Sequence, residues 1–158
     1  MTHVVLGATG QIGTELAKWL HKDHGNRIRL VSRSPRKVND TDELCNADLL
    51  DAKQALRALE GAKVAYLTAG LPMDTQRWVE QWPTLMNNAI NACKTHGTKL
   101  VFFDNTYMYP QTNATQTEET DFQPHGEKGR VRAKIATTLL AAMRHGEIEA
   151  LICRASVR

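Results

Sequence analysis

The sequence predicts an α/β fold of the doubly wound kind, in which helices cover both faces of a parallel sheet and give three layers. Short apolar runs alternate with helical stretches along the whole chain, and this alternation is typical of a parallel sheet. The first apolar run leads into three evenly spaced glycines within VVLGATGQIG. A length of 158 residues, 42% of them hydrophobic, suits a single domain that we expect to occupy residues 1–158.

The start of the chain predicts a strand, a glycine-rich turn and a helix. Residues 3–6 form a continuous apolar run, as expected of a strand buried on both faces of a sheet. Beyond the glycines, apolar residues recur at every fourth position and place one stripe along a helix: Ile12, Leu16 and Leu20. Gly25 and Asn26 are expected to end this helix, and the alternating residues 27–31 to form the second strand.

Two more strands and a short helix follow. We expect a third strand around residues 45–49 and a fourth over residues 63–69. Between them, Asp51 has the side chain of an N-cap and Gly61 provides a stop. The helix between these two signals carries three apolar residues: Ala55, Leu56 and Leu59.

A long helix and a fifth strand come next. Residues 74–96 have a helical pattern that Gly97 closes, and Pro83 is expected to kink or divide the helix. Its candidate core residues are Trp78, Leu85, Ile90 and Cys93. Residues 99–103 are the expected fifth strand.

The last part of the chain predicts one more helix and a sixth strand. A loop rich in Thr, Asn, Gln and Pro occupies residues 105–126. The following helix ends at Gly146 and has its apolar residues on one side: Ile135, Leu139, Leu140 and Met143. Residues 150–153 are the expected sixth strand, and no repeat or linker divides the chain.

The composition excludes several classes of function. A formal net charge of +3 is only mildly basic, and the dispersed positive residues argue against a nucleic-acid partner. Three cysteines without a CxxC pair indicate a reducing compartment, and no third ligand accompanies the histidines of the first helix, so no metal site is expected. No apolar run has the length of a membrane span. We therefore expect a cytoplasmic protein without a membrane partner.

The three glycines have the spacing of a dinucleotide-binding turn. Gly7 would permit the tight turn, Gly10 the close approach of a pyrophosphate, and Gly13 the packing of the helix on the strand. The expected anion donors are backbone N–H groups at the start of the helix: Thr9, Gly10, Gln11 and Ile12. The alternative is that the glycines serve turn geometry alone. No Gly-Lys-Ser/Thr follows, which excludes a nucleotide-hydrolase phosphate loop.

The end of the second strand favours NADP over NAD as the cofactor. An acidic residue there would bind the ribose 2′-hydroxyl of NAD, but this position holds Ser32 and Arg33. Ser32 can donate a hydrogen bond and Arg33 can bind phosphate oxygens with two N–H groups, and Arg36 lies nearby. Alternatively, Arg33 and Arg36 are ordinary surface charges.

Five stretches of the sequence resemble one family in the right order. They are Gly7-Ala-Thr-Gly10-Gln-Ile-Gly13, Ala47-Asp-Leu-Leu-Asp51, Tyr66-Leu-Thr-Ala-Gly70, the end of the fifth strand through Val101 to Pro110, and Ile152-Cys-Arg-Ala-Ser156. The chain resembles the extended and atypical short-chain dehydrogenases/reductases, which include the NAD-dependent epimerase/dehydratases and have an NAD(P)-binding Rossmann-like fold. The resemblance implies that Asp48 and Leu49 border the adenine and that Ala69 and Gly70 lie beside the cofactor's ribose.

The catalytic residues of that family are only partly matched. Its active members have Tyr-x-x-x-Lys on the helix after the fifth strand, and here the spacing falls on Arg130 and Lys134. Arginine does not give up its proton, so Arg130 cannot replace the tyrosine, whereas Lys134 could still bind the nicotinamide ribose. The family's serine position falls on Asn105, which can polarise a carbonyl group. Tyr107 or Tyr109 could supply a displaced phenol, or both could serve packing alone.

Two main functions remain open on the residues alone. The first is an NADP-binding oxidoreductase or epimerase-like protein that transfers hydride to or from an unknown small carbonyl or hydroxyl substrate. The second is a non-catalytic NADP sensor or regulator. The resemblance also implies a C-terminal substrate-binding part that this sequence lacks, so a truncated module is a third option, and a homodimer would cover the apolar surface that such a module exposes.

Overall fold

Six parallel strands form one sheet in the order β3-β2-β1-β4-β5-β6, in a computed structural model that describes residues 1–24 and 27–156. The strands are β1 (Thr2–Leu6), β2 (Arg27–Ser32), β3 (Glu43–Asn46), β4 (Val64–Leu67), β5 (Lys99–Asp104) and β6 (Ala150–Arg154). The helices are α1 (Gln11–His24), α2 (Ala52–Ala58), α3 (Thr75–His96) and α4 (Gly126–Arg144). This strand order is that of the doubly wound dinucleotide-binding sheet.

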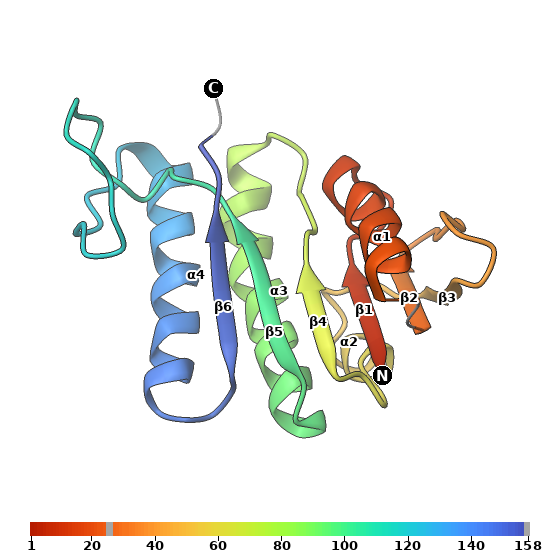
Figure 1. The fold of residues 1–158 in the computed structure, drawn as a ribbon. Helices are drawn as coiled ribbons and strands as arrows, with labels where there is room; N and C mark the ends of the chain where they lie inside the picture. Colours follow the sequence, from red (N-terminus) through yellow and green to blue (C-terminus); the bar gives the residue numbers. More distant parts are fainter. Residues whose placement is uncertain (25–26, 157–158) are drawn as a thin grey trace.

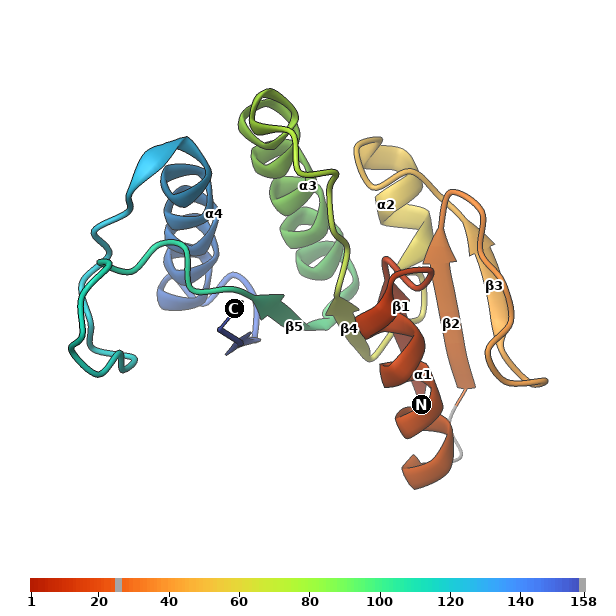
Figure 2. The same ribbon diagram turned by 90° about the horizontal axis from the view of Figure 1, so that it is seen from above.

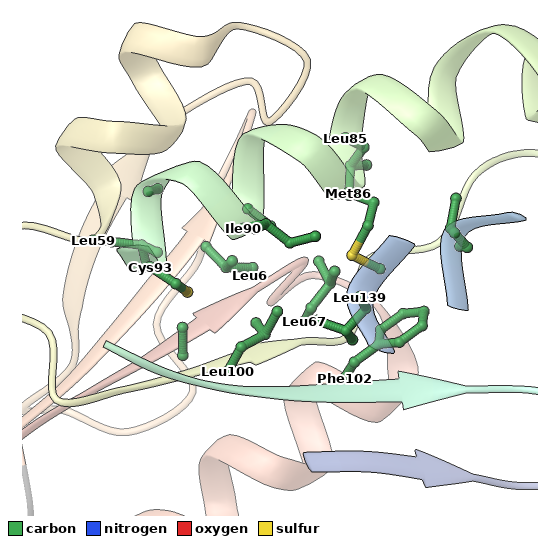
Figure 3. Packing of buried hydrophobic residues seen from close by; sticks show 14 of the residues in the cluster. Leu6, Leu59, Leu67, Leu85, Met86, Ile90, Cys93, Leu100, Phe102 and Leu139 are labelled. Atoms are coloured by element: carbon green, nitrogen blue, oxygen red, sulfur yellow. The ribbon is translucent and has the colours of Figure 1, made fainter. Parts of the chain in front are cut away.

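The helices cover the two faces of the sheet unequally. Figure 2 shows α2, α3 and α4 on one face, while α1 lies on the other, over the middle of the sheet. The largest apolar cluster fills the space between the sheet and the three helices, and its members point toward one another from both layers (Figure 3). A smaller cluster under α1 includes Val5, Ala17 and Leu30. The fold is therefore the predicted three-layer α/β sandwich, with a thinner layer on the α1 side.

The candidate site lies where the order of the strands reverses, beside β1. β2 and β4 lie on opposite sides of β1, and all strands run parallel, so their carboxyl ends meet along one edge of the sheet (Figure 1). In such sheets, ligands bind where the chain leaves neighbouring strands toward opposite faces. The turn after β1 and the loops after β2, β3 and β4 all lie at this edge.

The expected face of α1 is wrong at one position. Ile12 is 44% exposed, whereas the buried positions of the helix are Gly13, Ala17 and Leu20. The helix packs on the sheet through its glycine, which turns the preceding residue outward. The expected helix end at residues 25–26 lies outside the described residues.

Two further expectations need correction. The third strand ends at Asn46 rather than at residue 49, because the Asp48 carboxylate accepts the Leu50 N–H at 2.9 Å and forms a turn there. α3 is not divided at Pro83, which lies inside an unbroken helix of 22 residues. Eight buried residues hold α3 against its neighbours, and this packing outweighs the missing backbone donor.

Candidate functional site

The turn between β1 and α1 requires glycine at two of its three glycine positions. Gly7 has a φ of 90°, and a Cβ atom there would lie 2.4 Å from the Cα of Ala69. A Cβ on Gly13 would lie 2.7 Å from the carbonyl oxygen of Gly7 and 2.9 Å from the Cα of Ala8. Both glycines are therefore needed by the protein's own packing, as the close approach of helix and strand predicts.

Gly10 is different, because its missing side chain leaves open space. The only atom within 4 Å of a Cβ built there is the Gly7 carbonyl oxygen, at 3.4 Å. The first backbone bond of α1 runs from the Thr14 N–H to the Gly10 carbonyl at 3.0 Å, so the N–H groups of residues 11–13 precede the helical ladder. An open turn beside three such donors fits the diphosphate of a dinucleotide.

A cleft of about 730 Å³ opens at this turn. Nine of the predicted cofactor-binding residues line it: Gly7, Thr9, Gly10, Ser32, Arg33, Asp48, Leu49, Ala69 and Gly70. They come from the ends of β1, β2, β3 and β4, which the strand order brings together. The α3 side of the cleft, formed by Arg77, Gln81 and Leu85, was not predicted. These residues have no motif, and only the packing of α3 beside the loop after β3 brings them here.

The other predicted cofactor residues lie next to the cleft or away from it. Gln11 and Ile12 are exposed at the start of α1, and Gly13 lies beneath the turn. Arg36 lines a neighbouring hollow of about 450 Å³ that shares Thr9 and Ser34 with the cleft. Lys134 is exposed on α4 and does not line the cleft.

The wall at the end of β2 carries a cation and no carboxylate. The Ser32 hydroxyl accepts the Ser34 N–H at 3.2 Å, and the amide of Asn46 donates to the Arg33 carbonyl, which fixes the loop to the end of β3. The Arg33 side chain is exposed and takes part in none of the ion pairs found in residues 1–24 and 27–156. It is free to bind an anion that enters the cleft.

The end of β5 holds the predicted polar residues in a compact turn. The Asn105 side-chain oxygen accepts the Tyr107 N–H at 3.1 Å, which leaves the Asn105 amide NH₂ as a donor. The Tyr107 ring stacks on Trp78 with ring centroids 6.0 Å apart. The Tyr109 hydroxyl is buried and accepts from the Arg154 guanidinium at 2.9 Å. Asn105 and Tyr107 therefore lie together, but neither of them lines the cleft, and Tyr109 is buried in the interior.

Four basic residues alternate along the start of α4, and the structure separates them into two pairs. Arg130 and Lys134 are exposed. Lys128 instead faces α3, where its Nζ atom lies 3.2 Å from the Met73 carbonyl oxygen and 5.4 Å from the Trp78 ring centroid. Arg132 is buried on the same side. The sequence signal for this arrangement is the spacing of three and four residues that joins Lys128 and Arg132 to the buried Ile135.

Arg132 belongs to a buried ionic cluster that no motif in the sequence predicts. Its Nη2 atom lies 2.6 Å from Oδ1 of Asp104, and Nε of Arg154 lies 3.2 Å from Oδ2 of the same carboxylate. Burial lowers the pKa of the Arg132 guanidinium, and the Asp104 charge opposes that shift. The guanidinium also lies 4.5 Å from the centroid of the Trp82 ring. The cluster ties the ends of β5 and β6 to α4.

Neither a metal-ion site nor a membrane-spanning helix is found in the described part of the chain. Residues 1–24 and 27–156 contain no group of three or more His, Cys, Asp or Glu that could hold a metal ion. None of the helices described is long and apolar enough to span a membrane.

Known proteins that are similar to this chain point to the same kind of ligand as the cleft does. A model of the family described as NAD(P)H-binding matches residues 7–124. The fold is similar to that of UDP-glucose 4-epimerase from Thermus thermophilus in complex with NAD, with a TM-score of 0.82, 18% identity, and coverage of 98% of this chain and 54% of that one. It is also similar to uronate dehydrogenase from Agrobacterium tumefaciens, with a TM-score of 0.83, 18% identity, and coverage of 94% and 58%.

This chain spans little more than half the length of those two proteins, and at such identities the structures share the fold alone. None of the curated proteins compared with the chain matches it in sequence. The family model covers the glycine turn, the ends of β2 and β4, and the whole of α3. The chain therefore belongs to the NAD(P)H-binding family and has the Rossmann fold.

Proposed function

We propose that this chain binds NADP(H) in the cleft and that the complete protein is an oxidoreductase acting on a small carbonyl or hydroxyl compound. The observation that supports the cofactor most is the combination of an open Gly10 position with the cation Arg33 on the adjacent wall. Ser32 and Arg33 would hold the 2′-phosphate. Asp48 and Leu49 would border the adenine, and Ala69 and Gly70 would lie beside the ribose.

The proposed reaction is reduction of a carbonyl group or its reverse. When bound, NADPH would supply the hydride for the carbonyl carbon and would be oxidised to NADP⁺. The carbonyl oxygen then needs one proton, which the Tyr107 hydroxyl would donate, and the free amide NH₂ of Asn105 would orient that oxygen.

A second function has its own supporting observation. α4 has no tyrosine, and the residue at the expected tyrosine position, Arg130, is exposed. If Tyr107 only packs on Trp78, the protein would bind NADP(H) without using it, as a sensor or regulator that passes the state of the cofactor to a partner.

NADPH oxidation distinguishes the two functions. Protein saturated with NADPH is incubated with a panel of aldehydes, ketones and keto acids, and loss of NADPH absorbance is followed. We expect turnover with some members of the panel and a loss of at least about tenfold in kcat for Tyr107→Phe, because the proton donor is removed. Tyr66→Phe is the matched control, because Tyr66 lies away from the cleft and its hydroxyl pairs with His3. Full activity of Tyr107→Phe would contradict the assigned proton donor, and no turnover with bound NADPH would favour the sensor.

A further inference from the structure

The α3 side of the cleft carries a cation that the glycine motif does not explain. Arg77 lies in the first turn of α3, and Gln81 follows one turn later on the same wall. α3 follows β4, whereas Arg33 follows β2, and these two strands lie on opposite sides of β1. The two arginines therefore approach the glycine turn after β1 from opposite sides.

The charges lining the cleft are unbalanced in favour of an anion. The charged lining residues are Arg33, Arg77 and Asp48. One oxygen of the Asp48 carboxylate already accepts the Leu50 N–H at 2.9 Å. Within the described ranges, 1–24 and 27–156, none of the ion pairs includes Arg77, and its side chain is exposed to the cleft. A guanidinium in this position is available to a ligand.

The stability of α3 gives no reason for a cation at this position. Positive side chains are disfavoured in the first turn of a helix, because the N-terminal N–H groups already create positive potential there. The helix start is satisfied by Asp74, whose carboxylate accepts the Arg77 backbone N–H at 2.8 Å. The Arg77 side chain adds a further positive charge beside these N–H groups. A phosphate group in the cleft would turn this repulsion into attraction.

We infer that Arg77 binds the diphosphate of the dinucleotide from the α3 side, opposite the N–H groups of the glycine turn. This inference rests on the proposed cofactor site. It divides the two arginines by role, because Arg33 lies on the β2 side, where the 2′-phosphate is expected, and Arg77 on the β4 side. Arg33 selects NADP over NAD, whereas Arg77 strengthens the binding of both.

Ligands that carry the diphosphate, the 2′-phosphate or both test this division. Wild type, Arg77→Ala and Arg33→Ala are titrated calorimetrically with NADPH, NADH, ADP-ribose and 2′-AMP. We expect Arg77→Ala to weaken the three diphosphate ligands by about tenfold each and to leave 2′-AMP unchanged. Arg33→Ala should show the reverse, with weaker NADPH and 2′-AMP and unchanged ADP-ribose. Arg77→Lys should recover part of the loss, because it restores the charge but not the planar pair of donors.

Arg130→Ala is the matched control, since it removes an exposed arginine from α4 outside the cleft. Unchanged diphosphate affinity of Arg77→Ala would overturn the inference and leave the cofactor site intact. A loss confined to NADPH and 2′-AMP would overturn it as well, by moving Arg77 to the 2′-phosphate. Wild-type protein that binds none of the four ligands would overturn both the inference and the proposed function. Circular dichroism confirms that each variant is folded.

Discussion

A methyl group on Gly10 would have fewer close neighbours than one on Gly13. Substitutions at the two positions therefore test cofactor binding and folding stability separately. A Cβ on Gly10 reaches only the Gly7 carbonyl at 3.4 Å, whereas one on Gly13 lies within 3.0 Å of three atoms. We expect Gly10→Ala to change the free energy of unfolding by less than about 1 kcal/mol but to weaken NADPH binding by at least about tenfold, because the methyl group occupies ligand space.

Gly13→Ala is the structural counterpart of that variant. Its methyl group would push against the backbone of Gly7 and Ala8, and overpacking of this kind costs about 1–3 kcal/mol of stability. Urea unfolding and NADPH titration of both variants provide the check. Equal losses of stability in the two variants would mean that Gly10 also serves packing alone.

The buried Asp104 carboxylate is a second single residue whose substitution should change the free energy of unfolding. Its side chain is 0% exposed and pairs with two guanidinium groups, those of Arg132 and Arg154. Asp104→Asn leaves both cations without a counter-ion, and we expect the free energy of unfolding to fall by about 3–5 kcal/mol. Arg132→Met should cost less, because Arg154 still pairs with the carboxylate. Urea unfolding of both variants measures this order, and the reverse order would show that Arg132 is the main stabilising partner.

At the scale of single elements, α3 shows how packing overrides a local signal. Pro83 predicts a kink or a break, and the helix continues without a break from Thr75 to His96. Pro83→Ala restores a backbone donor in the helix interior, so we expect the free energy of unfolding to rise by about 1–3 kcal/mol. Thermal and urea unfolding measure this change. A less stable variant would mean that the proline ring makes contacts worth more than the hydrogen bond.

Elements that are marked by local turn and cap residues are the ones that the sequence predicts well. The glycine turn, the Asp51 cap and the Gly97 stop are local signals, and the structure has each where it is expected: the Asp51 carboxylate accepts two helical N–H groups and Gly97 has a φ of 63°. The face of a helix is harder to predict when apolar residues occur on more than one side. Ile12 extends the apparent stripe of α1 although it is exposed, and alternating cations on α4 hide the inner pair Lys128 and Arg132.

At the scale of the whole molecule, strand order decides what the sequence can predict about the site. The residues on strand ends follow from motifs in order along the chain. Arg77 and Gln81 do not, because only the placement of α3 beside the cleft brings them to it. The ionic cluster likewise joins residues 104, 132 and 154, which are distant in sequence and meet only after β5, α4 and β6 pack. Long-range contacts of this kind leave no periodic pattern.

The sheet also exposes apolar surface on its thinner side. Phe103 is 37% exposed and Leu151 is 51% exposed, on neighbouring strands of the face that carries α1. In Figure 1 the strands β5 and β6 lie at the end of the sheet away from α1, with no helix of the described chain in front of them.

We propose that Arg33 makes the cleft select NADP(H) over NAD(H), and a paired titration of the two nucleotides tests this claim. NADPH and NADH are titrated into wild-type protein and Arg33→Ala, with the fluorescence of the reduced nicotinamide as the signal. We predict that wild type binds NADPH at least about tenfold more tightly than NADH and that Arg33→Ala removes this preference while keeping NADH affinity. Tighter binding of NADH, an unchanged preference in Arg33→Ala, or no binding of either nucleotide would contradict the claim.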